Sequence, residues 1–181
     1  MNPTQHIKNF RDVGESINLL VGLEVMKESV LYRGGRLNAI FKHEELLLIP
    51  SILNLRIAKD EKKFNCIYLH VPATDKLENY DTTHRKVKKW INNVMGTMLK
   101  EEVHFPIYIH CTSGKDRTGV IVAVILKALG IEDKVIIEEY LLSDGITGQA
   151  EITQALKGIG DINTYLKSEY VCLLRKVLLN A

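Results

Sequence analysis

Cysteine is scarce in this sequence, which contains only Cys66, Cys111 and Cys172. An odd number of cysteines with no closely spaced pair is not the pattern of a disulfide-stabilised secreted domain. The C-x-x-C spacing that is typical of structural zinc sites is also missing. We therefore expect a protein of a reducing compartment, and we predict no metal site.

Long hydrophobic runs are absent as well. The chain begins Met-Asn-Pro-Thr-Gln-His, without the apolar segment of a signal peptide. Its longest apolar-rich stretch, residues 120–126, is far shorter than the roughly 20 residues that span a bilayer. We expect a cytoplasmic protein, although export as an effector, by a machinery that reads no N-terminal signal, stays open.

Neither sign of charge is in excess. The 24 Lys and Arg against 22 Asp and Glu give a net charge of +2, which is too small to indicate a nucleic-acid partner. Hydrophobic residues make up 46% of the 181 residues, enough for a substantial core. No repeat or low-complexity linker divides the chain, so residues 1–181 are predicted to form one domain.

Apolar segments of strand length alternate with segments of helical periodicity, which predicts an α/β domain whose sheet is flanked by helices. The predicted strands are residues 30–33, 51–57, 66–71 and 106–110. The predicted helices are residues 38–49, a long helix capped by Thr82 or Thr83 and ending near 102, and residues 117–129, 132–143, 148–157 and 161–179. We expect the nearly all-apolar helix 117–129 at the centre of the fold, ended by Gly130.

The most informative segment is residues 110–119, which read His-Cys-Thr-Ser-Gly-Lys-Asp-Arg-Thr-Gly. It joins a buried strand to the start of a buried helix. Unpaired backbone N–H groups of such a loop and of the first helical turn form an anion site, reinforced by the helix dipole. Gly114 permits the tight curl, and Arg117 supplies a planar fork of donors that matches two phosphate oxygens.

The same environment suits a nucleophile. A helix N-terminus and nearby cations favour the thiolate form of cysteine, so Cys111 is the candidate for in-line attack on phosphorus. Thr118 could donate its hydroxyl to the thiolate, and His110 could orient the loop from behind. The segment is not a Walker A loop, because Asp116 follows Gly-Lys in place of Ser or Thr.

These residues resemble the signature loop of the cysteine-based protein tyrosine phosphatase superfamily, above all its microbial branch of tyrosine, dual-specificity and lipid phosphatases. Four other segments are similar to elements of that branch. They are residues 9–14 (Asn-x-Arg-Asp-x-Gly), 31–35 (a Tyr-Arg-Ser turn, with Gly34 for Ser), 54–56 (Asp-Leu-Arg, with Asn54 for Asp) and 161–165.

The resemblance implies a tyrosine-phosphatase-like fold with a central sheet of four or five mostly parallel strands. It implies a phosphocysteine intermediate and no metal or other cofactor. The phosphate-binding loop would consist of Thr112, Ser113, Gly114, Lys115, Asp116 and Arg117, with Cys111 and Arg117 as catalytic residues.

The general acid stays open at this stage. Asp75 follows a predicted strand and a proline, like the mobile acid loop of tyrosine phosphatases. Asp116 lies in the loop itself, where the lipid-active branches are proposed to carry their acid. Asp81 is a weaker third candidate, and the fixed position of Asp116 in the motif favours it slightly.

The substrate also stays open between two classes. The first is phosphotyrosine together with phosphoserine or phosphothreonine in proteins, and the second is phosphoinositides or inositol polyphosphates, which Lys115 and Asp116 favour. Residues 84–89, rich in Lys and Arg, could contact an anionic membrane peripherally or form a solvated helix face. We expect a monomer. Two other classes of protein are disfavoured. A catalytically dead phosphate-binding module would not need Cys111, Arg117 and Thr118, which are all present. A sulfurtransferase or an arsenate reductase would leave the Lys-Asp-Arg-Thr-Gly ending unexplained.

Overall fold

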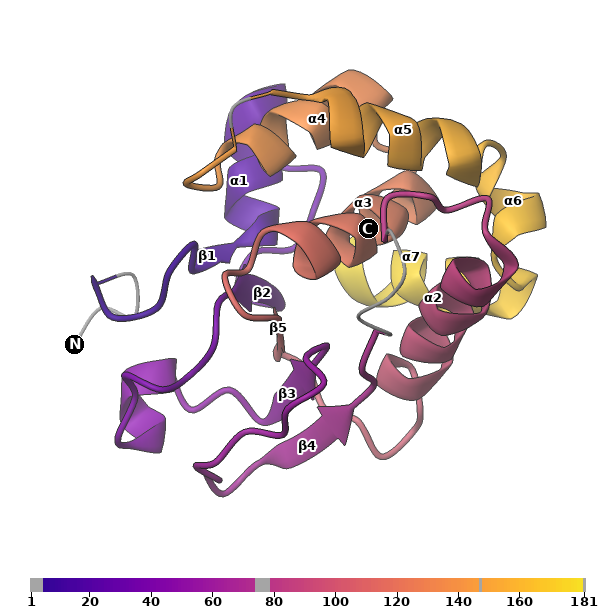
Figure 1. The fold of residues 1–181 in the computed structure, drawn as a ribbon. Helices are drawn as coiled ribbons and strands as arrows, with labels where there is room; N and C mark the ends of the chain where they lie inside the picture. Colours follow the sequence, from indigo (N-terminus) through magenta and orange to yellow (C-terminus); the bar gives the residue numbers. More distant parts are fainter. Residues whose placement is uncertain (1–4, 74–78, 147, 181) are drawn as a thin grey trace.

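The computed structural model describes residues 5–73, 79–146 and 148–180, and at its centre lies a five-stranded sheet (Figure 1). The strand order is β1-β2-β5-β3-β4. Only the edge strand β1 is antiparallel, and the other neighbours pair in parallel. The predicted mostly parallel sheet is therefore confirmed. The strands are β1 (Arg11–Asp12), β2 (Leu31–Gly34), β3 (Ser51–Asn54), β4 (Ile67–His70) and β5 (Ile107–His110).

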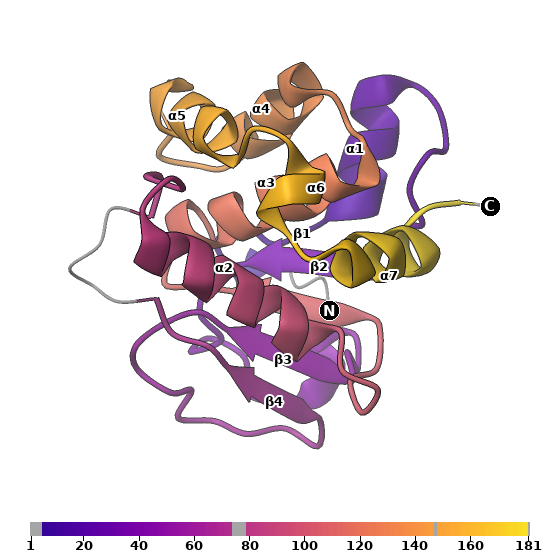
Figure 2. The same cartoon turned by 90° about the vertical axis from the view of Figure 1, so that its right-hand side faces the viewer.

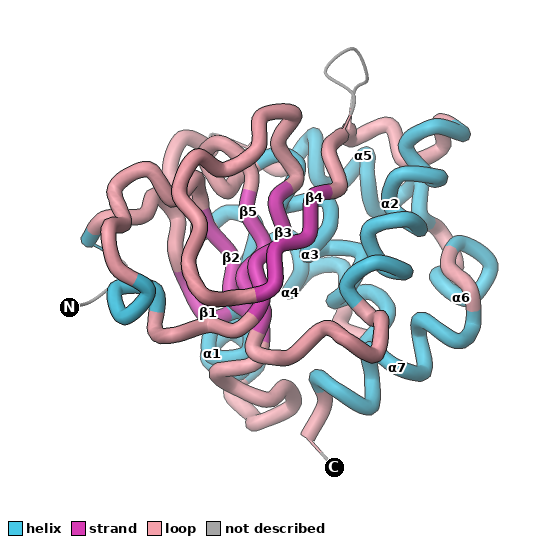
Figure 3. The backbone as a smooth tube through the Cα atoms, turned by 90° about the horizontal axis from the view of Figure 1, so that it is seen from below, coloured by secondary structure: helices cyan, strands magenta, loops and turns pink. Residues whose placement is uncertain are grey.

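Helices α2 and α7 lie over one face of the sheet, and α1, α4 and α5 gather at one end of it (Figures 1 and 2). The opposite face is covered by the segments around the short 3₁₀ helix η2 (Figure 3). The helices are α1 (Val13–Val21), η2 (His43–Leu46), α2 (Arg85–Met98), α3 (Asp116–Leu129), α4 (Asp133–Leu141), α5 (Ala150–Ile159), α6 (Ile162–Tyr165) and α7 (Ser168–Leu178).

Strand side chains alternate between two cores, as the pleat of a strand requires. Leu53, Ile107 and Ile109 point into the larger cluster under the helices. Ile52 and Tyr108 point into a smaller cluster on the other face. Since both faces of the sheet are covered, the central strands are mostly apolar on both faces, and their short apolar runs are what predicted them from the sequence.

The central position of α3 is confirmed. Its residues from Val120 to Leu126 are all buried, and it contacts β2, β5, α4, α5, α6 and α7. It begins one residue earlier than predicted, at Asp116, and it ends at Gly130, which takes the left-handed conformation at φ 85°. The start of this helix therefore lies directly after the loop that follows β5.

Several predicted boundaries were wrong. Residues 38–49 form only the 3₁₀ helix η2. The helix expected from Thr82 or Thr83 begins at Arg85 and is capped by His84, because the Thr82 hydroxyl instead donates to the carbonyl of Ala155 at 2.7 Å. The predicted helix 161–179 is divided into α6 and α7.

The cysteines are free thiols. Cys172 is exposed on α7, and Cys66 is half-buried just before β4. Among the described residues, no helix is both long and apolar enough to cross a membrane.

Candidate active site

Cys111 directly follows β5, the central strand of the sheet, and only 1% of its surface is exposed. Strands β2 and β3 flank β5 in parallel, so the cysteine lies where the carboxyl ends of three parallel strands meet. This edge is where open α/β sheets bind ligands. The loop from Thr112 to Lys115 then leads into α3, as the sequence predicted.

Three consecutive carbonyl groups of this loop are held by donors from the N-terminal part of the chain. The carbonyl of Thr112 accepts from the backbone N–H of Arg36 at 3.2 Å. The next one, on Ser113, accepts from the Nδ2 of Asn9 at 2.8 Å. The third, on Gly114, accepts from the Nη2 of Arg33 at 2.9 Å.

This arrangement fixes the direction of the loop amides. In a trans peptide the carbonyl and the following N–H point to opposite sides of the chain. Carbonyls directed at Arg36, Asn9 and Arg33 therefore turn the N–H groups of residues 113, 114 and 115 the other way. Successive amides directed to one side form an anion-binding nest.

Gly114 allows the loop to approach β2 closely, and Gly34 leaves room for the side chain of Tyr108. Gly114 has φ +71°, and a Cβ there would lie 2.3 Å from the carbonyl carbon of Gly34. A Cβ on Gly34 would in turn meet the hydroxyl of Tyr108 at 2.5 Å. Gly34 stands where the resemblance leads one to expect serine, and a serine Cβ there would collide with the large side chain of Tyr108.

The Arg33 side chain is completely buried. Its Nη1 pairs with Glu139 of α4 at 2.6 Å, and the other carboxylate oxygen of Glu139 pairs with Arg11 at 2.8 Å. Burial lowers the pKa of Arg33 to about 10, and the charge of Glu139 opposes that shift. The paired guanidinium remains the charged partner that a buried carboxylate requires.

The sequence reasoning missed Glu139. A signal was present, because Glu139 lies three residues after the buried Ile136 and next to the buried Tyr140, on the face of α4 that helical periodicity directs inward. A carboxylate on such a face needs a cation, and Arg33 and Arg11 are the cations that it finds.

His110 lies behind the cysteine and is fully buried. Its Nε2 is 2.9 Å from the Oδ2 of Asp60, its Nδ1 is 3.3 Å from the carbonyl of Cys111, and its ring stacks on Tyr108. Asp60, a second residue that sequence reasoning missed, also pairs with Arg56 at 3.4 Å.

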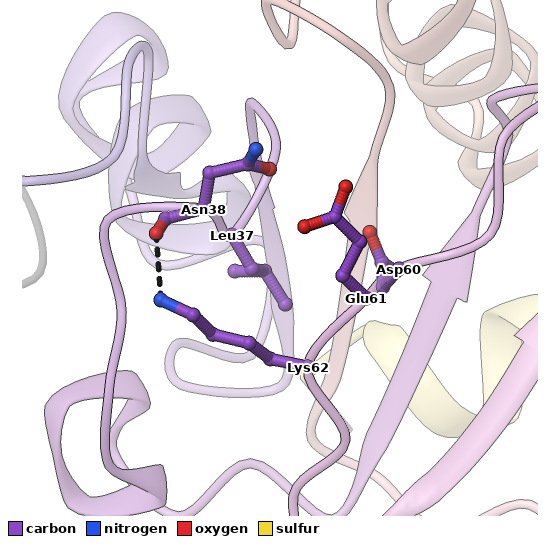
Figure 4. Close-up of a pocket in the computed structure, with 5 residues that line it drawn as sticks. All are labelled: Leu37, Asn38, Asp60, Glu61 and Lys62. Carbon is purple, nitrogen blue, oxygen red and sulfur yellow. Dashed lines mark hydrogen bonds between the residues drawn. The ribbon is translucent and has the colours of Figure 1, made fainter.

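A small pocket next to Asp60 is lined by Leu37, Asn38, Asp60, Glu61 and Lys62 (Figure 4). The Nζ of Lys62 donates to the carbonyl of Asn38 at 2.8 Å and so ties the two walls together. Two carboxylates line this pocket, which is unfavourable for a phosphate. The loop is therefore a better candidate anion site than this pocket.

Arg117 and Thr118 lie on the first turn of α3. The guanidinium of Arg117 makes two long contacts, to the carbonyl of Leu55 at 3.3 Å and to the Oγ1 of Thr112 at 3.4 Å. The buried hydroxyl of Thr118 has no hydrogen-bond partner among the described residues. The expected contact between this hydroxyl and the thiol of Cys111 is thus not formed in this conformation.

The structure gives the surroundings of two of the three candidates for the general acid. The Oδ1 of Asp116 accepts from the hydroxyl of Tyr80 at 2.8 Å and lies 3.8 Å from the Nζ of Lys115. Asp81 instead accepts from the hydroxyl of Thr83 at 2.5 Å. Asp75 lies outside the described residues.

The fold and the loop define a class, the cysteine-based phosphatases. The sequence matches the tyrosine phosphatase family over residues 2–175, and the chain belongs to this family. Over 39 residues it is 49% identical to the triple specificity protein phosphatase PtpB of Mycobacterium tuberculosis (strain ATCC 25618 / H37Rv), a match that covers 22% of this chain and only 14% of PtpB.

Two solved structures share the fold. The core catalytic domain of the PP-IP phosphatase SIW14 from S. cerevisiae has a TM-score of 0.56 and 20% identity, covering 83% of this chain and 91% of that one. DUSP15 has a TM-score of 0.52 and 17% identity, covering 83% of this chain and 95% of that one. At these identities the likeness concerns the fold.

Proposed function

We propose that this protein hydrolyses phosphomonoesters through a phosphocysteine intermediate on Cys111. The observation that carries the proposal is the anchoring of the three carbonyls of residues 112–114 to Arg36, Asn9 and Arg33, which turns the following amides to the opposite side of the loop after the buried Cys111. Membership of the tyrosine phosphatase family supports the same chemistry. Oriented amides that need no reorganisation are an effective way to stabilise a developing anionic transition state.

In the first step, the thiolate sulfur of Cys111 forms a bond to phosphorus while the bond from phosphorus to the ester oxygen breaks. The loop amides and the guanidinium of Arg117 bind the three non-bridging oxygens. The long contacts of Arg117 to Leu55 and Thr112 leave its fork ready to exchange them for phosphate oxygens.

We assign the general acid to Asp116. In the first step its carboxyl group gives a proton to the departing ester oxygen. In the second step the resulting carboxylate takes a proton from water as the water oxygen attacks phosphorus, and the bond between sulfur and phosphorus breaks to release inorganic phosphate and the thiolate. Its contact with Tyr80 and its place in the loop support this choice over Asp81, which is bonded to Thr83.

The proposed substrates are phosphotyrosine and, with it, phosphoserine and phosphothreonine in proteins. The alternative is a phosphoinositide or an inositol polyphosphate, which a specific feature favours. Lys8 and Arg36 have exposed side chains, and their backbones are bonded to Gly35 and Thr112 at the loop. With Lys115 they give three cationic residues in or beside the loop, which supports the binding of additional phosphates.

The proposed partners are these substrates, with no nucleic acid, and the protein would act as a monomer.

The exposed Arg85, Lys86, Lys88 and Lys89 at the start of α2 support a peripheral contact with an anionic membrane. Co-sedimentation with phosphatidylserine vesicles, repeated with Lys88→Glu and Lys89→Glu together, tests this contact. Equal binding by the charge-reversed variant would contradict it.

The central experiment measures phosphate release from phosphotyrosine, phosphoserine and phosphothreonine peptides, soluble phosphoinositides and inositol polyphosphates. We expect release that disappears in Cys111→Ser. An absence of release from every substrate would overturn the proposed function.

The choice between the two substrate classes needs a matched pair of variants. If polyphosphorylated substrates are preferred, Arg36→Ala lowers kcat/KM for them more than for phosphotyrosine. Lys134→Ala, which removes an exposed cation on α4, is the control and should change neither.

A further inference from the structure

Tyr80 connects the candidate acid to the interior of the protein. Its side chain is buried, and its hydroxyl donates to the Oδ1 of Asp116 at 2.8 Å. The hydroxyl of Tyr140, from α4, lies 2.7 Å from that of Tyr80, and the two rings meet edge to face at 6.3 Å. The three side chains come from distant parts of the sequence and form one continuous chain of hydrogen bonds.

The direction of this chain follows from counting protons. A phenol has a single O–H proton. Tyr80 donates its proton in the hydrogen bond to Asp116. In the hydrogen bond between the two phenols, Tyr140 must therefore be the donor and the oxygen of Tyr80 the acceptor. Burial raises the pKa of both phenols, which keeps both hydroxyls protonated, and successive donors in a chain polarise one another.

The two oxygens of Asp116 therefore differ. Oδ1 receives the Tyr80 proton and lies on the side of the Lys115 ammonium, 3.8 Å away. Oδ2 has no hydrogen-bond partner within the described ranges. When the carboxyl group is protonated, a hydrogen bond donated to Oδ1 leaves Oδ2 as the oxygen that carries the proton.

We propose that Tyr80 is a positioning residue that holds Oδ1 of Asp116, so that the proton on Oδ2 is presented to the departing ester oxygen, with Tyr140 fixing the Tyr80 hydroxyl in turn. This inference rests on the proposed function and concerns the same site. In the step, the proton leaves Oδ2 for the ester oxygen, which keeps the electron pair of the broken bond to phosphorus. The sulfur of Cys111 forms the new bond.

The test uses the dependence of kcat/KM on the leaving group. An ester oxygen that leaves readily as an anion, as in 4-nitrophenyl phosphate, needs little help from an acid, whereas the oxygen of phenyl phosphate needs a proton. A complete general acid is worth about 10²–10⁴-fold. We expect Asp116→Asn to lose such a factor on phenyl phosphate and Tyr80→Phe to lose about tenfold, with much smaller losses on 4-nitrophenyl phosphate.

Tyr165→Phe is the matched control. It removes another buried tyrosine hydroxyl, which donates to the carbonyl of Thr82 at 2.8 Å, two residues beyond Tyr80 and away from Asp116. A merely structural effect would lower kcat/KM for both esters equally, in Tyr165→Phe as in Tyr80→Phe. We expect Tyr165→Phe to keep the wild-type ratio between the two esters, and Tyr140→Phe to shift it in the same direction as Tyr80→Phe but less.

Several results would overturn the inference while leaving the phosphatase proposal intact. The first is a Tyr80→Phe variant that is active and keeps the wild-type ratio of kcat/KM between the two esters. The second is a Tyr165→Phe variant that changes this ratio as much as Tyr80→Phe does. The third is an Asp116→Asn variant that leaves the ratio unchanged. A wild-type protein that releases no phosphate from either ester, by contrast, contradicts the proposed function itself.

Discussion

The side-chain amide of Asn9 donates to the carbonyl of Ser113 at 2.8 Å, across 104 positions of the sequence. Its carbonyl oxygen accepts from the backbone N–H of Asp144, also at 2.8 Å. Asn9 has φ 58°, in the left-handed region that asparagine and aspartate tolerate best among residues with a side chain. One amide thus joins residue 9, the loop after Cys111 and the segment after α4.

The Asn9→Asp variant tests this anchor. Aspartate keeps the backbone tolerance but replaces the Nδ2 donor with an oxygen that repels the carbonyl of Ser113. Loss of a donor to a part-buried carbonyl costs about 1–3 kcal/mol, so we expect kcat/KM to fall about 10- to 100-fold. The control is Asn92→Asp on α2, which removes an amide donor to the carbonyls of Lys88 and Tyr165. Equal activities of the two variants would contradict the role of Asn9.

Gly114→Ala should close the loop to phosphate. The new Cβ would lie 2.3 Å from the backbone of Gly34, in addition to the cost of a positive φ, about 1–2 kcal/mol. We expect binding of vanadate and turnover to be lost together. Gly130→Ala is the control for φ alone, since its φ is +85° and a Cβ there meets nothing within 4 Å. Vanadate binding retained by Gly114→Ala would show that the close contact is unimportant.

Arg33→Met should destabilise the fold as well as the loop. The variant leaves Glu139 buried with only one of its two arginines and releases the carbonyl of Gly114. Breaking a buried ion pair costs about 3–5 kcal/mol. The control, Lys127→Met, removes a pair with the exposed Asp133 and should cost about 0–1 kcal/mol. Urea unfolding measures both, and similar losses in the two variants would refute the assignment.

Arg117→Lys should impair catalysis with little effect on folding. Lysine keeps the charge but loses the planar fork that binds two phosphate oxygens. Removing one donor to a transition-state oxyanion costs about 10²–10³-fold in kcat, and we expect a loss of that order. The free energy of unfolding should hardly change, because the contacts of Arg117 to Leu55 and Thr112 are long. A kcat within tenfold of the wild type would rule out the assigned role.

The four parallel strands and the central helix could be predicted because each contains an unbroken run of apolar residues. The polar edge strand β1 has no such run and was missed. Helix α1 was also missed. Its buried face includes Gly14 and Asn18, where the Asn18 amide donates to the carbonyl of Met26 and a Cβ on Gly14 would collide with Lys27. Polar and small residues chosen for such specific contacts hide the helical periodicity of the hydrophobic residues.

The sequence by itself determined the nucleophile candidate, the loop and its arginine. All of them lie within seven consecutive residues, 111–117, where strand, loop and helix follow from local composition. Local geometry is what a contiguous segment encodes.

Only the tertiary structure decided which residues hold that loop and orient its acid candidate. Arg33 reaches Gly114 across 81 positions and Glu139 across 106, and Tyr80 reaches Asp116 across 36. No periodicity records such pairings, because they depend on which strands become neighbours. The parallel pairing of β2 with β5 brings Arg33 and Gly34 beside the loop, and the packing of α4 brings Glu139 and Tyr140 to them.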